Sequence, residues 1–459
     1  MSGSVPMLGD VVRLRREVKE RRIEPAVSLG RVAAGLLYGD DTGWQGSPEG
    51  FLERTYITRA MRRVTLAAAA RLSGRTRLRL GDELVNAASV ILLPSVLGGG
   101  KTHLMAFLLH VVHLAGRGRL DVLERHDPEL TGSLAEAGEG LAGARIAVIV
   151  GDQSRFAPTD SSPAEIDGVR VETIWDLMAV QLGADVEPLG WREAPSVDYI
   201  RDRVFAGRPV LVVIDEIVSY LARIDEVRRD QVITFLRNLF QAADESPRAV
   251  VVLSLPAEAS PAGDLGVVEH DALVLGRSAV QDIYNNARRV YPVIVQPLDM
   301  KTDIVMVLRK RLLENSVDEL EDDGRRVAGL VRQGLDDSTM LQSVREVFGS
   351  EMRFLARIAE AYPFHPLFVE MLLDLGSVIR GFKRTRGLLE IVMDVLLDME
   401  ETGSMGRQYL VMPWNLRVER EDIRAKILAD HPRLDYYNRV LLNDLQAINE
   451  VMSEDKVRR

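Results

Sequence analysis

The chain has 459 residues, 46% hydrophobic and 27% charged, which is enough for about three domains of roughly 150 residues with substantial cores. It has no cysteine, which excludes disulfides, zinc–thiolate sites, iron–sulfur clusters and cysteine nucleophiles. The net charge of −10 disfavours wholesale nucleic-acid wrapping but allows local basic patches. No apolar run approaches the ~18 residues of a membrane span, and the start lacks a signal-peptide pattern. We therefore expect a cytoplasmic protein with no membrane partner.

Residues 1–85 are expected to form an N-terminal helical region. A basic segment at 11–22 precedes residues 51–72, whose apolar side chains recur at three- and four-residue spacing. An arginine-rich group follows, at Arg75, Arg77 and Arg79. Both basic groups allow contact with a DNA backbone, but no aromatic residues interleave with them, so solvated surfaces are the preferred interpretation.

Residues 86–300 are expected to form an α/β domain. Short β-branched apolar runs alternate here with helix-length segments, as in a parallel sheet buried on both faces and flanked by helices. The runs cover residues 88–93, 145–150, 210–214, 249–255 and 290–295, and helical spacing marks 102–116, 173–182 and 230–243.

A helical domain is expected after the sheet. We assign residues 301–400 to a helical lid and 401–459 to a helical extension. Amphipathic segments cover 303–314, 354–361, 367–375, 387–399 and 420–428. The chain ends directly after a helical pattern, so we expect it to be the front part of a longer protein.

The strongest local signal is a glycine-rich loop between the first apolar run and the next helix, which is the context that a phosphate-binding P-loop (Walker A) requires. The candidate nucleotide-binding residues are Gly98, Gly99, Gly100, Lys101, Thr102 and His103. The glycines let backbone N–H groups surround an anion. Lys101 would reach the β- and γ-phosphates, and Thr102 would ligate Mg²⁺. Ser95 replaces the usual first glycine, and a plain glycine-rich turn is the alternative.

Two adjacent acids, Asp215 and Glu216, end the apolar run 210–214, as in a Walker B motif. Asp215 would hold the metal shell and Glu216 would activate a water molecule. A solvated acidic turn is the alternative. One apolar run lies between loop and acids in sequence, an order typical of the additional-strand, catalytic-glutamate class of ATPases. Ser254, near the end of the next run, would contact the γ-phosphate or the water, or be an ordinary buried serine.

Phosphoryl transfer spreads negative charge over the γ-oxygens, and arginines offset it. The candidates are Arg277, Arg288 and Arg289, before the last run, and Arg386, at the start of a lid helix. Surface ion pairing is the alternative for each of them. His110 and His113 share a helical face but lack nearby acids, so packing is preferred to metal binding.

Together, these parts resemble AAA+ ATPases. More narrowly, the chain resembles the large ATPases of unknown function encoded with DNA methyltransferases and helicases in prokaryotic anti-phage defence clusters. The resemblance covers about residues 51–399. It is carried by FLERTY at 51–56, GGGKTH at 98–103, DE at 215–216 with YL at 220–221, SLP at 254–256, YPFHP at 362–366 and RTRG at 384–387.

The resemblance implies an AAA+ fold, Mg-ATP hydrolysis, and assembly with itself or with other defence proteins. DNA would be an indirect partner. We therefore expect ATP hydrolysis to drive conformational change in such an assembly. The alternatives are a slow nucleotide-dependent switch or scaffold, a DNA-stimulated translocating motor and, more remotely, a small-molecule kinase.

Overall fold

The computed structural model describes residues 5–95, 100–256, 277–299, 302–335, 338–378, 385–417 and 420–428. The chain forms two units. The sheet unit is Ala26–Asp299, and the helical unit combines Met1–Pro25 with Met300–Arg459. The second boundary lies next to the expected one at residue 300. The expected region 1–85, in contrast, is divided between the two units.

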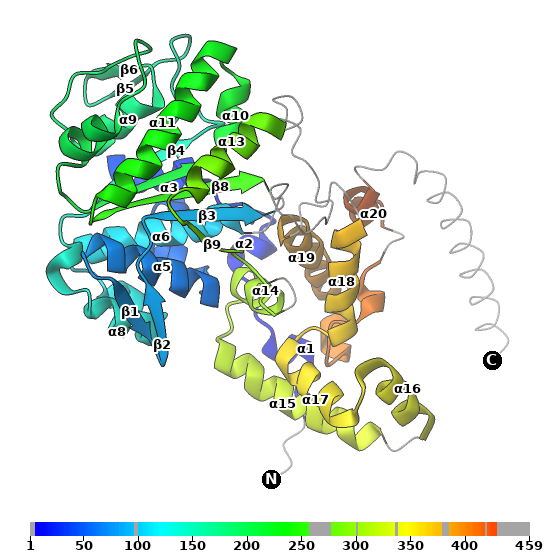
Figure 1. The fold of residues 1–459 in the computed structure, drawn as a ribbon. Helices are drawn as coiled ribbons and strands as arrows, with labels where there is room; N and C mark the ends of the chain where they lie inside the picture. Colours follow the sequence, from blue (N-terminus) through cyan, green and yellow to red (C-terminus); the bar gives the residue numbers. More distant parts are fainter. Residues whose placement is uncertain are drawn as a thin grey trace. The chain divides into compact units, whose positions relative to one another are not determined.

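The five predicted apolar runs form one parallel sheet, which confirms the predicted α/β class (Figure 1). The strands are β3 (Val90–Ser95), β4 (Arg145–Val150), β7 (Val210–Asp215), β8 (Ala249–Pro256) and β9 (Val293–Ile294). Their order is β4-β7-β8-β3-β9, so β8 lies between β3 and β7. All neighbours are parallel, so the carboxyl ends of the strands share one edge.

Alternate residues of each strand pack against helices on opposite faces of the sheet. Leu93 and Val213 belong to the core shared with α3, α5 and α6, whereas Leu92 and Val212 belong to the core shared with α9, α11 and α13. These helices are α3 (Leu29–Tyr38), α5 (Arg59–Leu72), α6 (Lys101–Gly116), α9 (Ile174–Gln181), α11 (Glu226–Glu245) and α13 (Arg277–Arg288). Both faces are therefore covered, as the unbroken apolar runs require.

The predicted helix 51–72 is two helices, α4 (Pro48–Glu53) and α5. The break occurs because Thr58 caps α5, its side chain accepting from the N–H of Met61 at 3.2 Å. The helical prediction is wrong at its end, where β1 (Arg77–Leu80) and β2 (Glu83–Asn86) form an antiparallel hairpin. The exposed-buried alternation of β1 has the period of a strand.

The other elements of the sheet unit are short. They are η1 (Gly43–Gln45), α7 (Asp121–Glu124), α8 (Pro128–Ala135), η2 (Gly138–Leu141), the hairpin of β5 (Ala164–Ile166) and β6 (Val169–Val171), a π-helix (Tyr199–Phe205) and α10 (Ile217–Ala222).

Packed helices form the helical unit. They are α14 (Ile304–Leu312), α15 (Val317–Gly334), α16 (Ser338–Phe348), α17 (Glu351–Ala361), α18 (Pro366–Val378), α19 (Thr385–Glu401) and α20 (Glu421–Leu428), with 3-10 turns η5 (Ser404–Arg407) and η6 (Pro413–Asn415). The periodicity missed α15 and α16. Across all the described residues, no helix combines the length and apolarity needed to cross a membrane.

Residues 5–25 pack with the helical unit. The predicted basic helix 11–22 is only two short turns, α1 (Leu8–Val11) and α2 (Arg16–Lys19). Between them Leu14 is buried and forms a β-bridge with Leu313. Arg13 pairs with Glu319 at 2.8 Å and Lys19 with Glu400 at 3.2 Å. The basic charges of this segment are thus partly offset by acids of its own unit.

We predict that Leu14→Ala loosens the helical unit and leaves the sheet unchanged. Loss of a buried leucine costs about 2–5 kcal/mol, and Leu14 contacts the end of α14. Hydrogen exchange should accelerate at the amides of α14 but not at those of β7 and β8. Leu78→Ala, which removes an equally buried leucine of the sheet unit, should give the opposite pattern. If Leu14→Ala left the exchange rates of α14 unchanged, the segment around Leu14 would not pack with the helical unit as described.

Candidate functional site

The sheet register brings two predicted motifs together at the carboxyl edge. Ile214 lies opposite Leu253 and Leu93 lies opposite Ser254, so Asp215 emerges beside Ser254. The loop that follows β3 leads into α6 at the same edge. Gly98 and Gly99 lie outside the described residues, as does the side chain of Ser95. Gly100, Lys101 and Thr102 are described at the start of α6.

Asp215 is the centre of this site. Its side chain is almost fully buried, and its Oδ2 accepts from the hydroxyl of Thr102 at 2.9 Å. Its Oδ1 accepts from the hydroxyl of Ser254 and from the backbone N–H of Glu216 at 3.1 Å. The carboxylate therefore joins α6, β8 and the residue before α10. Because Asp215 is buried and hydrogen bonded, the alternative interpretation of a solvated acidic turn is wrong for this residue.

Burial raises the pKa of Asp215, and the hydrogen bonds from Ser254 and Thr102 and the charge of Lys101 act against that rise. Lys101, the first residue of α6, is itself buried. The site thus holds an acid and a base away from water. A buried carboxylate with hydroxyl and amide donors around it is suited to a bound cation.

The backbone beside Asp215 has two left-handed residues. Gly100 precedes α6 with φ 82°, a conformation that glycine adopts without strain. Glu216 precedes α10 with φ 53° and ψ 34°, which is strained for a residue with a side chain. Helix N-termini follow both residues, and their N–H groups and dipole favour an anion.

Gly151 supports the strained turn and was missed by the motif analysis. Its N–H donates to the carbonyl oxygen of Asp215 at 2.9 Å. A Cβ on Gly151 would lie 1.8 Å from the carbonyl oxygen of Glu216, so no side chain fits. Arg223 donates to the Gly151 carbonyl at 2.7 Å and holds the same loop. A glycine directly after the apolar run 145–150 was the available sequence signal.

His103 links the start of α6 to the segment at 51–56. Its Nε2 lies 3.0 Å from the hydroxyl of Thr55, and its ring centroid is 4.9 Å from that of Phe51. These contacts do not involve Asp215. They give His103 a packing role, besides its predicted one in nucleotide binding.

Of the candidate arginines, Arg288 and Arg289 lie away from Asp215 within the sheet unit. Arg288 and Arg289 are exposed and precede β9, at the amino edge of the sheet, and the Arg288 guanidinium lies 5.4 Å from the Tyr284 ring centroid. Arg277 begins α13, with its side chain outside the described part. Arg386 is exposed in α19 of the helical unit.

His110 of α6 is a packing residue. His110 is fully buried, its Nε2 lies 3.0 Å from the Gln45 carbonyl oxygen, and its ring stacks on Phe51. Burial lowers the pKa of His110 to about 3 and that of His113 to about 4, so both are neutral near pH 7. Within the described residues, no group of three or more His, Asp or Glu side chains is placed to hold a metal.

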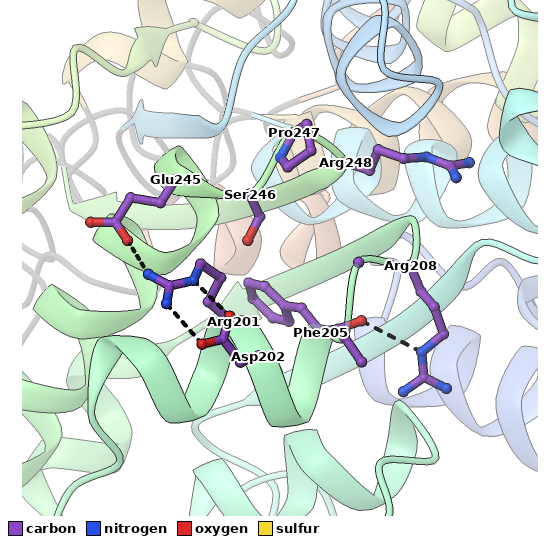
Figure 2. A pocket seen from close by; sticks show the side chains of 10 residues that line it. Arg201, Asp202, Phe205, Arg208, Glu245, Ser246, Pro247 and Arg248 are labelled. Atoms are coloured by element: carbon purple, nitrogen blue, oxygen red, sulfur yellow. Dashed lines mark hydrogen bonds and ion pairs between the residues drawn. The ribbon is translucent and has the colours of Figure 1, made fainter.

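A pocket of about 410 Å³ lies at the opposite, amino edge of the sheet (Figure 2). Its arginines are already engaged. Arg201 pairs with Asp202 at 2.8 Å and with Glu245 at 2.7 Å, and Arg248 donates to the Leu72 carbonyl at 2.9 Å. Because these cations hold acids and helix-end carbonyls, the carboxyl edge is the better candidate site.

We predict that Gly151→Ala is strongly destabilising. The new methyl group would displace the backbone of Glu216, which should lower the free energy of unfolding by about 2–4 kcal/mol. Gly132→Ala is the matched control, because its Cβ would meet nothing within 4 Å and alanine favours the helix by up to about 1 kcal/mol. Denaturant unfolding of both variants measures the difference. Equal free energies of unfolding for the two variants would mean that the backbone at Glu216 can shift to accept the new methyl group at no cost.

We predict that Asp215→Asn stabilises the protein at neutral pH by about 1 kcal/mol in nucleotide- and metal-free buffer, because it removes a buried charge. Since burial raises the pKa of Asp215 in the folded state, this group favours folding at low pH and loses that contribution as pH rises. The difference in free energy of unfolding between variant and wild type should therefore vanish in acid. It should grow as pH rises above the ordinary pKa range of aspartate. Denaturant unfolding across pH measures it. Asp185→Asn, at an exposed position, should show no such trend.

Family models cover almost the whole chain. The DUF499 N-terminal domain matches residues 7–294, and the DUF499 second domain matches residues 299–458. No curated protein and no solved structure matches the chain. The junction between the two matches falls at the boundary between β9 and the helical unit. Since the first model alone covers more than half of the sequence, the protein belongs to the DUF499 family.

Proposed function

We propose that the sheet unit binds ATP with Mg²⁺ and hydrolyses it. The observation that carries this proposal is the hydrogen bond between Thr102 and Asp215, 2.9 Å long, which joins two predicted motifs 113 residues apart. P-loop NTPases hold the magnesium of their nucleotide with these two residue types, at the end of the phosphate loop and at the end of a neighbouring strand.

The sheet topology supports the additional-strand class. In a simpler P-loop arrangement the strand before the loop would pair directly with the strand that bears the acid, whereas here β8 lies between β3 and β7. Ser254 of this additional strand bonds Asp215. With the helical unit after the sheet, this arrangement agrees with the AAA+ resemblance that we propose for the chain.

The residues present fit magnesium. Mg²⁺ prefers hard oxygen ligands, and Thr102 and Asp215 supply a hydroxyl and a carboxylate. A cation there would also favour the ionised form of Asp215, whose burial is otherwise costly. When bound, the ion would offset the negative charge of the phosphates.

The other residues would act on the phosphates and the water. Lys101 and the N–H groups at the start of α6 would bind the β- and γ-phosphates. The Glu216 carboxylate would take a proton from the attacking water while the bond from the γ-phosphorus to the bridging oxygen breaks, giving ADP and inorganic phosphate. Ser254 would orient the water or the γ-phosphate. The fixed turn at Gly151 would hold Glu216 in place.

A second chain would complete the site. Because Arg288 and Arg289 lie at the amino edge of their own sheet, they would serve as charge-stabilising arginines only towards a neighbouring copy. Arg277 is a further candidate towards a neighbouring copy, and Arg386, in the predicted lid, is the candidate from the same chain. We propose self-association for this reason. A role in an anti-phage defence assembly, with other proteins of the cluster as partners, rests on the sequence resemblance alone.

We predict that ATP turnover per chain rises with protein concentration and is lost in Glu216→Gln. General-base catalysis contributes about 10²–10⁴-fold, so turnover should fall by about 10² or more, while binding of a fluorescent ATP analogue persists. Lys101→Ala should lose both binding and turnover. The matched control is Glu187→Gln, at an exposed glutamate of the same unit, which should match wild type.

The possible outcomes separate the alternatives. Turnover unchanged in Glu216→Gln would remove the hydrolytic role of this residue. Tight ATP binding with background turnover at every concentration would favour the switch or scaffold. Turnover that rises steeply with duplex DNA at low salt would favour the translocating motor.

A further inference from the structure

The free edge of the sheet carries an unexplained groove. Strand β9 pairs with β3 on one side, and no strand among the described residues pairs with it on the other. A groove of about 520 Å³ lies along this edge, between β9, β2 and α5. At one end the hydroxyl of Thr58, the cap of α5, lies 3.4 Å from the Pro297 carbonyl oxygen.

The exposed apolar residues of the sheet unit gather at this groove. Among its described residues, five large apolar side chains stand out as exposed, at Leu84, Val227, Tyr291, Val293 and Ile294. Leu84, Val293 and Ile294 line the groove, with 47%, 36% and 47% of their surface exposed. Tyr291, 93% exposed, precedes β9 by two residues. Such clustering marks an interaction surface for protein, not a random scatter of surface apolar residues.

Backbone groups of β9 are available for pairing. The N–H of Val295 donates to the Leu92 carbonyl at 3.0 Å, so Val295 faces β3. Successive residues of a strand direct their N–H and C=O groups to alternate sides. The N–H and C=O of Ile294 therefore face the groove, where an extended segment can bond them.

The groove is positively charged although the chain is acidic overall. Arg59 and Arg63, both lining it, share the single carboxylate of Glu83 at 2.9 and 3.1 Å. On β1, Arg77 and Arg79 are exposed and lie across from Asn86 and Leu84, which line the groove. In the described part of the chain, neither of these two arginines has an acidic partner.

From the free edge, the apolar lining and the charge, we infer that this groove binds an extended acidic polypeptide segment of a partner protein, added as a strand to β9. Alternate side chains of the segment would enter the groove, and its acidic residues would meet the arginines. An exposed apolar lining with unpaired backbone groups favours polypeptide over nucleic acid. This inference is independent of the proposed ATP hydrolysis.

The test selects nine-residue random peptides displayed on phage against the full chain, with counter-selection on Ile294→Asp. We expect the retained sequences to alternate apolar and acidic residues. The best one, made synthetically with a fluorescent label, should bind wild type saturably in an anisotropy titration. Ile294→Asp and Leu84→Asp, on two different elements, should each weaken binding at least tenfold. Val227→Asp, at a 72% exposed position outside the groove, should leave it unchanged.

Backbone methylation tests strand addition directly. Two versions of the peptide are made, one N-methylated at its odd-numbered residues and one at its even-numbered residues. One version should lose binding and the other should keep it, because only alternate N–H groups face β9. Lys101→Ala should bind the peptide as wild type does, which separates this site from the nucleotide site.

Three results would overturn the inference. The first is that no peptide is enriched. The second is that both methylated peptides bind equally well, which would mean that only side chains dock. The third is that a 20-base-pair DNA duplex binds at low salt, binds Arg77→Glu more weakly, and is not displaced by the peptide. The last result would assign the surface to nucleic acid.

Discussion

The buried carboxylate of Asp215 is the interaction on which the candidate site depends. Its hydrogen bonds come from the first turn of α6, from β8 and from the backbone of the next residue. These elements are far apart in sequence, and only the parallel register of β3, β8 and β7 places them side by side. A polar group at this depth costs free energy unless it is well partnered. Neutral donors and Lys101 offset part of that cost, so the site is arranged before any ligand arrives.

The two edges of the sheet differ in the helix ends that they receive, because helices in a parallel α/β fold run antiparallel to the strands. The carboxyl edge receives helix N-termini, whose partial positive charge suits anions. The amino edge receives helix C-termini, and arginines bond the carbonyl groups there. Arg71 donates to the carbonyls of Asp244 and Ser246 at the end of α11, and Arg145 donates to that of Gly183 after α9. Some of the many arginines of this chain thus stabilise helix ends.

Sequence patterns predicted the sheet well because its strands are buried on both faces and read as unbroken apolar runs. They also singled out Thr102, Asp215 and Ser254, which are linked by hydrogen bonds in the structure. The roles of these residues and of Lys101 stay predictions. The patterns failed where tertiary contacts decide. The hairpin β1–β2 and the short turns of the first 25 residues depend on packing partners distant in sequence. The position of Gly151 after an apolar run was a usable signal, but its role follows from the close approach of the Glu216 backbone, which is distant in sequence.

The packing of residues 5–25 with the helices that follow residue 302 has a consequence for biosynthesis. The sheet unit is in effect an insertion within the helical unit, so Leu8, Leu14 and Val18, all buried in the mature fold, leave the ribosome long before their packing partners. At roughly 5–20 residues per second, synthesis of the intervening chain takes on the order of 15–60 s. During that interval an apolar, arginine-rich segment is exposed in a nascent chain whose sheet unit is still being synthesised. Chaperones that recognise such segments would find it available for this period, and the helical unit can close only after translation has passed Met300.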